Sequence, residues 1–272
     1  DEEHKTKYSS EYVFGTPEGL KLAVNALYAL QRYYANDTEN ATIFALERGT
    51  DLAVTNGGTG NFYGIYDPNY LKPSASQVGF MWRTMDQIIG KANEIIAAAE
   101  DLEDTPSLRA TVSEAKCFRA QSYFLLYRTF DRIWLNMLPT TAENVNDPRD
   151  FHAASEKEVF ELIYEDLEYA ITNLDWVSDE AGRFTQAAAR HMKAKAALWL
   201  KDWDTTLEQV EEIEKSGHFD LIALNEVFNA GDLNHKEALM VQQWSKNPGG
   251  NLSNATPKGN YYACLLYTSP SP

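Results

Sequence analysis

The sequence predicts a mainly α-helical fold built from packed pairs of helices. Apolar residues recur at helical spacing in about six separate segments, and no clear hairpin signal interrupts them. The strongest case is residues 183–217, which hold two amphipathic stretches with only a short break near Asp202. Two helices joined so closely pack antiparallel, so we expect a helical hairpin here.

The first long helix is predicted to begin at Pro17. Thr16 is a good capping residue, proline fits the first helical position, and Glu18 suits the positive end of the helix dipole. Residues that then recur near helical spacing are Leu20, Val24, Leu27 and Tyr34.

Two further helices are predicted over residues 77–101 and from Pro106 to about Arg128. The first has an apolar stripe of Met81, Met85, Ile88, Ile89, Ala92, Ile95 and Ile96. The second places Cys117, Ala120, Phe124 and Tyr127 on one face. Residues 140–153 are polar and contain proline, so they are expected to connect this helix to the next.

Ser155 and Glu158 form a capping box that opens the next helix. Residues 184–200 follow as an Ala-rich stretch of high intrinsic helicity, with Ala188, Met192, Ala196 and Leu200 at successive i, i+4 positions.

The last helix of the predicted pair has a second apolar stripe of Trp203, Leu207, Val210 and Ile213. We expect Trp199 and Trp203 to pack in the core, and Gly217 to stop the helix in a left-handed conformation. Short extended pieces are expected after Gly217 and around Met240.

Residues 49–73 are predicted to form a long aromatic-rich loop, because glycine and proline are too dense there for a helix. Its aromatics either pin the loop onto the helices or form a platform for a ligand with flat apolar faces and polar edges, such as a sugar. The ligand-binding residues expected on this second interpretation are Asp51, Asn56, Asn61, Tyr63, Tyr66, Tyr70 and, on the following helix, Trp82.

Composition excludes several classes of protein. Forty acidic residues against 24 basic ones give a formal charge of -16, which argues against nucleic-acid and anionic-lipid partners. Cys117 and Cys264 are too few for a disulfide framework, and no apolar run reaches membrane-spanning length. The five histidines are scattered singly, and no nucleophile, phosphate or zinc motif occurs. We therefore expect no catalytic residues, no metal and no cofactor.

Four segments, in order along the chain, resemble one known family. Residues 113–139 read SEAKCFRAQSYFLLYRTFDRIWLNMLP, which resembles the hallmark AEARFLRAYYYFELVRLFGDVPL of the SusD/RagB family, although Asp131 stands where the hallmark has glycine. Residues 183–222 are similar to the family's paired helices, residues 82–96 to its W-x-x-x-Y-x-x-I-x-x-A-N helix, and residues 235–244 to a strand-like segment.

The resemblance implies a non-enzymatic, lipid-anchored nutrient-binding protein of the outer-membrane surface. Its fold would be tetratricopeptide-like helical hairpins with long loops. Its partner would be a SusC-like TonB-dependent transporter, and its ligand an oligosaccharide, a polysaccharide or a peptide. Family members are longer, so the chain is expected to be the N-terminal part, with residues 1–262 forming an incomplete SusD-like domain. Residues 263–272 continue no earlier pattern and are expected to be a non-native or truncated tail.

Two other functions stay open from the residues alone. A helical-repeat adaptor would bind proteins through an Ala-rich groove and would not need the tyrosines of the loop. An enzyme such as a glycosidase would need two carboxylates, for instance Asp51 and another acid, facing each other in one cleft.

Overall fold

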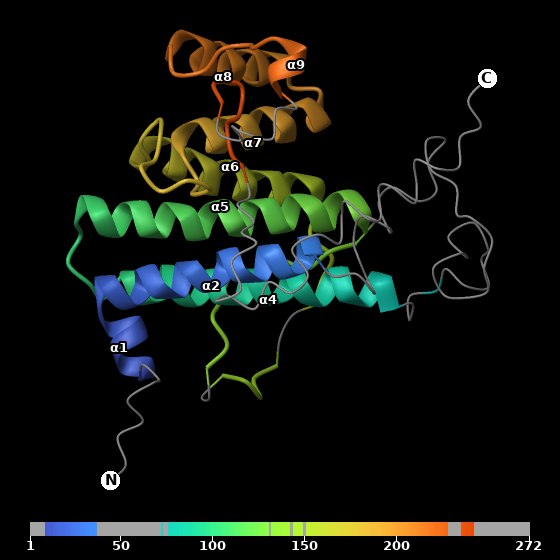
Figure 1. The fold of residues 1–272 in the computed structure, drawn as a ribbon. Helices are drawn as coiled ribbons and strands as arrows, with labels where there is room; N and C mark the ends of the chain where they lie inside the picture. Colours follow the sequence, from blue (N-terminus) through green and yellow to red (C-terminus); the bar gives the residue numbers. More distant parts are fainter. Residues whose placement is uncertain are drawn as a thin grey trace. The chain divides into compact units, whose positions relative to one another are not determined.

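A computed structural model describes residues 9–36, 72, 76–130, 132–141, 144–148, 151–227 and 235–241 of the chain. Within these residues there are helices and no strands, which confirms the predicted mainly α fold (Figure 1). The helices are α1 (Ser10–Gly15), α2 (Pro17–Asn36), α4 (Ser76–Ala99), α5 (Pro106–Thr129), α6 (Glu156–Asn173), α7 (Gln186–Leu200), α8 (Trp203–Lys215) and α9 (Leu224–Val227).

The chain divides into two compact units. One is formed by Asp1–Leu27 with Gln87–Gln243, and the other by Tyr28–Asp86 with Trp244–Pro272. The larger unit contains α5, α6, α7 and α8, and each of these helices packs against the next one along the chain (Figure 1). This succession of packed helices is the arrangement of a helical-repeat scaffold.

The helix starts follow the predicted capping chemistry. Thr16 Oγ1 accepts from Gly19 N at 3.1 Å, and Thr105 Oγ1 accepts from Leu108 N at 3.1 Å. At the start of α6, Ser155 N donates to Glu158 Oε2 at 2.7 Å while Glu158 N donates to Ser155 Oγ at 3.3 Å, so the capping box is confirmed. These side chains bind backbone groups that a helix end otherwise leaves without partners.

Helix α5 lies at the centre of the larger unit. Every residue over positions 111–120 is buried, charged side chains included, because neighbouring elements cover this helix on all sides. Cys117 is fully buried, and the Phe118 ring meets the Phe184 ring edge-on at 4.9 Å between centroids. The stripe expected on one face of this helix is therefore only part of its packing surface.

The helical hairpin of α7 and α8 is confirmed, and its turn is short. Lys201 adopts a left-handed conformation with φ of 60°, and Asp202 then caps α8 by accepting from Thr205 N at 3.2 Å. Gly217 also has a positive φ, of 70°, as predicted for the end of α8. The alanines of α7 are buried, so the Ala-rich face forms a packing surface and not an open groove.

The predicted core stripe of α8 is wrong. Trp203 and Leu207 are 56% and 59% exposed, Val210 is exposed as well, and Trp199 of α7 is 48% exposed. Helix α8 instead turns Gln209 inward, where the side chain is 2% exposed and its Oε1 accepts from Arg190 Nη1 at 2.8 Å. The face of α8 that meets α7 therefore carries Gln209, and most of the apolar stripe faces outward.

The chain after α8 contains no strand among its described residues, although two stretches run close together. Asp220 N donates to Lys236 O at 3.2 Å, and Ile222 N donates to Glu237 Oε2 at 3.2 Å. The extended pieces predicted after Gly217 and around Met240 thus amount to one backbone contact and the short helix α9.

Candidate functional site

The predicted ligand platform can be described at one position only. Asp51, Asn56, Asn61, Tyr63, Tyr66 and Tyr70 lie outside the described residues. Trp82 lies on α4 and is 36% exposed.

The surroundings of Trp82 combine an apolar underside with charged neighbours. Met81 and Met85 are buried and fix this side of α4, whereas Arg83 and Asp86 are exposed like Trp82. The Arg83 guanidinium folds back along the helix over Gly79, where an added Cβ would lie 2.8 Å from Arg83 Nη1. An exposed indole beside charged side chains offers stacking and hydrogen bonding together, which suits a polyhydroxylated ligand.

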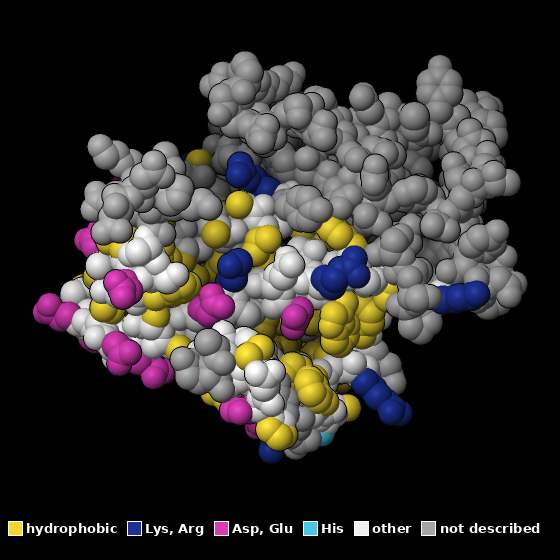
Figure 2. All heavy atoms as spheres, turned by 90° about the horizontal axis from the view of Figure 1, so that it is seen from below, with side chains coloured by type: hydrophobic (Ala, Val, Ile, Leu, Met, Phe, Trp, Pro, Cys, Tyr) yellow, Lys and Arg dark blue, Asp and Glu magenta, His cyan; other side chains and the backbone are white. Residues whose placement is uncertain are grey.

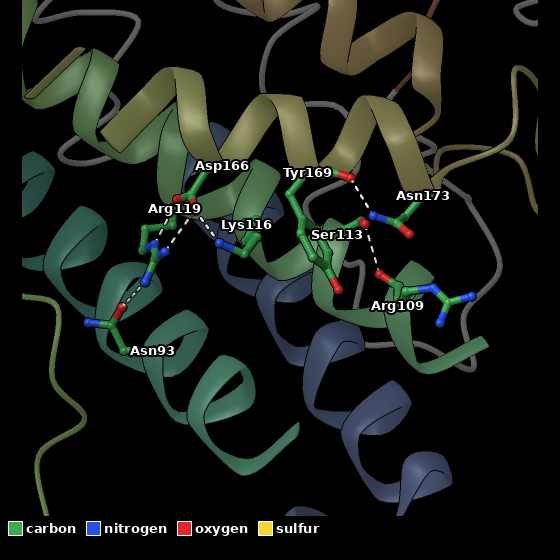
Figure 3. A network of polar contacts seen from close by, with 8 residues as sticks. All are labelled: Asn93, Arg109, Ser113, Lys116, Arg119, Asp166, Tyr169 and Asn173. Atoms are coloured by element: carbon green, nitrogen blue, oxygen red, sulfur yellow. Dashed lines mark hydrogen bonds and ion pairs between the residues drawn. The ribbon is translucent and has the colours of Figure 1, made fainter. Parts of the chain in front are cut away.

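Two charged residues of the hallmark segment, Lys116 and Arg119, point into the protein, where they meet Asp166. Asp166 of α6 is fully buried and accepts from Lys116 Nζ at 2.8 Å through Oδ1 (Figure 3). It also accepts from Arg119, with Nη2 to Oδ1 and Nε to Oδ2 both at 2.7 Å. This two-point pairing of a guanidinium with a carboxylate is the strongest geometry for a buried ion pair.

A second ion pair, whose two side chains are each 11% exposed, lies nearer the start of α5. Glu114 and Arg183 are within 3.5 Å of each other, and Arg183 Nη1 also donates to Asn25 Oδ1 of α2 at 2.8 Å. Glu180 lies 3.2 Å from Arg183 and accepts from Lys21 at 2.9 Å. The hydrogen bond from Lys21 and the charge of Arg183 lower the pKa of the Glu180 carboxyl. Arg183 therefore connects α2, α5 and the segment before α7.

This arrangement holds helices together and does not resemble a catalytic centre. The buried carboxylates of Asp166 and Glu114 each face a cation, whereas acid/base catalysis pairs groups in contrasting environments. Burial, with Glu114 and Asp166 nearby, raises the pKa of the Cys117 thiol well above its ordinary value, so it stays protonated and unreactive. Over the described part of the chain no three His, Cys, Asp or Glu side chains gather as metal ligands would.

Charged side chains of both signs are mixed on the described part of the face that Figure 2 shows. Acidic side chains are spread over this part, with Lys and Arg between them. Among the helices that the structure describes, none combines the length and the apolarity needed to cross a bilayer.

Sequence reasoning missed the buried network of Asn93, Lys116, Arg119 and Asp166. A signal was present, because Glu114, Lys116 and Arg119 interrupt residues 110–120, which are otherwise small or apolar. Three charges on different sides of such a helix indicate that it is buried all round and needs partners for them. Asp166 carries no such signal, since an acid on an amphipathic helix is usually exposed.

Comparisons with known proteins identify the fold and its relatives. No family model matches the chain. A SusD-like protein of Bacteroides ovatus is 25% identical over 233 residues, which cover 76% of this chain and 40% of that protein. A solved laminarin-binding SusD-like protein has a TM-score of 0.66 at 22% identity, over 75% of this chain and 46% of that chain. A crystal structure with xylogluco-oligosaccharide has a TM-score of 0.68 at 21% identity, over 83% and 46% of the two chains.

The chain is similar in sequence to SusD-like proteins and has their fold. It spans 40% of the length of its Bacteroides relative. Three charged residues of the hallmark segment, Glu114, Lys116 and Arg119, form ion pairs inside the protein and hold its helices together.

Proposed function

We propose that the chain is part of a glycan-binding protein that has no catalytic activity. Similarity to SusD-like proteins carries this proposal, because one similar solved protein is named for binding laminarin and another was solved with xylogluco-oligosaccharide. The buried ion pairs of the larger unit support a scaffold role for its helices. A polysaccharide or oligosaccharide is therefore the proposed ligand class, with peptides as the less favoured one.

The proposed contact residues are Trp82 together with Asp51, Asn56, Asn61, Tyr63, Tyr66 and Tyr70. Trp82 supports the assignment, because its side chain is 36% exposed on α4 beside the exposed charged residues Arg83 and Asp86. Sugar rings stack their C–H faces on aromatic rings, while amide and carboxylate groups bind the hydroxyls.

We further propose that the full-length protein works at the outer-membrane surface through a lipid anchor, beside a SusC-like TonB-dependent transporter. This part of the proposal rests only on the similarity of the chain to SusD-like proteins. Co-purification of the full-length protein with its genomic neighbour would test it, and the absence of any transporter from the purified complex would count against it.

Titration of the protein with a panel of glycans, laminarin and xylogluco-oligosaccharides among them, tests the binding function. We expect at least one glycan to bind, and Trp82→Ala or Tyr66→Ala to weaken that binding about tenfold or more, since a stacked aromatic contributes about 1–3 kcal/mol. Trp199→Ala is the matched control, because Trp199 is an exposed tryptophan of α7 outside the proposed site.

Two outcomes would contradict the proposal. If no glycan of the panel binds, the proposed glycan-binding function is wrong. If Trp82→Ala and Trp199→Ala weaken glycan binding equally, the assignment of the binding site is wrong. Hydrolysis of a bound glycan during the titration would show that the protein is an enzyme after all.

A further inference from the structure

The segment that leaves α5, residues 132–138, is held in place without secondary structure of its own. Ile133 is buried, the next three residues are half-buried, and Leu138 is 70% exposed. Ile133 O accepts from Ala154 N at 2.9 Å, which ties the segment to the residues just before α6. We call residues 132–138 the strap.

The strap is held at the backbone of one residue, Asn136. Asn136 O accepts from Asn93 Nδ2 at 2.7 Å and from Tyr123 Oη at 2.9 Å, and Asn136 N donates to Tyr123 Oη at 2.8 Å. Both hydrogen-bonding groups of this backbone position are thus bound by side chains from α4 and α5. A loop backbone satisfied by buried side chains loses much of its freedom to open.

The orientation of the Asn93 side-chain amide follows from its contact with Arg119, which is in turn paired with Asp166 (Figure 3). A carboxylate only accepts hydrogen bonds, so Asp166 draws Nε and Nη2 of Arg119 toward itself. Arginine only donates, so its remaining Nη1 must meet the oxygen of Asn93, at 2.8 Å. The Asn93 amide nitrogen then faces the other way, toward the carbonyl of Asn136.

We propose that Asn93 and Tyr123 are positioning residues that hold the strap, and that Asp166 and Arg119 set the side-chain orientation Asn93 needs. Arg119, Tyr123 and Asn136 all lie in the hallmark segment, so holding the strap accounts for these three polar residues together. The inference concerns the larger unit alone and does not depend on glycan binding.

Hydrogen–deuterium exchange of the full chain tests this proposal. In Tyr123→Phe, which keeps the ring and removes only the hydroxyl, we expect the peptide containing Asn136 to exchange about tenfold faster. Peptides from the centres of α5 and α6 keep their protection. Asn93→Asp should have the same local effect, because a carboxylate still accepts from Arg119 but repels the Asn136 carbonyl.

Tyr127→Phe is the matched control, since Tyr127 lies one turn further along α5 and donates to Glu156 Oε2 at 2.9 Å. It should leave exchange of the strap unchanged. Unchanged exchange at Asn136 in both Tyr123→Phe and Asn93→Asp overturns the proposal. So does uniform acceleration over the strap, α5 and α6, because that pattern shows loss of overall stability and no specific hold on the strap.

Discussion

At the scale of single residues, the carboxylate of Asp166 offsets the free-energy cost of burying Lys116 and Arg119. Replacing it with asparagine leaves two buried cations, Arg119 and Lys116, without the carboxylate that they share. We expect Asp166→Asn to lower the free energy of unfolding by about 3–5 kcal/mol, measured by urea denaturation. Asp104→Asn is the control, because the Asp104–Arg109 pair is exposed and contributes about 0–1 kcal/mol. Similar losses in the two variants would contradict this account of the network.

The capping box gives a pH-dependent prediction at the same scale. Hydrogen bonds from the Ser155 side chain and backbone lower the pKa of Glu158 below its ordinary value of 4.5. A carboxyl with a lower pKa in the folded state adds stability above the unfolded-state pKa and loses it as the pH falls through the folded-state value.

Glu158→Gln keeps an acceptor for the Ser155 amide but cannot titrate. Its stability relative to the parent protein should therefore improve as the pH falls below 4.5. Thermal unfolding of both proteins over the acidic range measures this difference, and parallel pH profiles would contradict the prediction.

At the scale of elements, the ends of α7 and α8 use the same left-handed conformation with different residues. Lys201 has φ of 60° and Gly217 has φ of 70°, yet only glycine adopts this region without a steric cost. Lys201→Gly should stabilise the protein and Gly217→Ala should destabilise it, each by about 0.5–1 kcal/mol in the free energy of unfolding. Chemical denaturation measures both, and two changes of the same sign would show that the turn chemistry is misassigned.

The sequence was sufficient for what depends on near neighbours in the chain. Caps at Thr16, Thr105 and Ser155, and the stop at Gly217, are short-range chemistry, so the helix boundaries could be predicted. The inward face of α8 could not, because it carries Gln209, whose partner Arg190 lies on another helix, while the apolar stripe faces outward. The same holds for Asp166, whose partners lie about 50 positions away along the chain.

At the scale of the whole molecule, one leucine on α6 and one on α8, with α7 between these helices, show where the core ends. Leu167 of α6 is 1% exposed, whereas Leu207 of α8 is 59% exposed although its sequence pattern is equally amphipathic. Leu167→Ala creates a cavity and should lower the free energy of unfolding by about 2–5 kcal/mol. Leu207→Ala removes side-chain atoms already in water and should change it by less than about 0.5 kcal/mol. Urea titration of the two variants under one condition makes the comparison direct, since the chemistry of the substitution is identical. A large loss for Leu207→Ala would mean that the outer face of α8 is covered in solution, and the core would then extend through the whole helical stack.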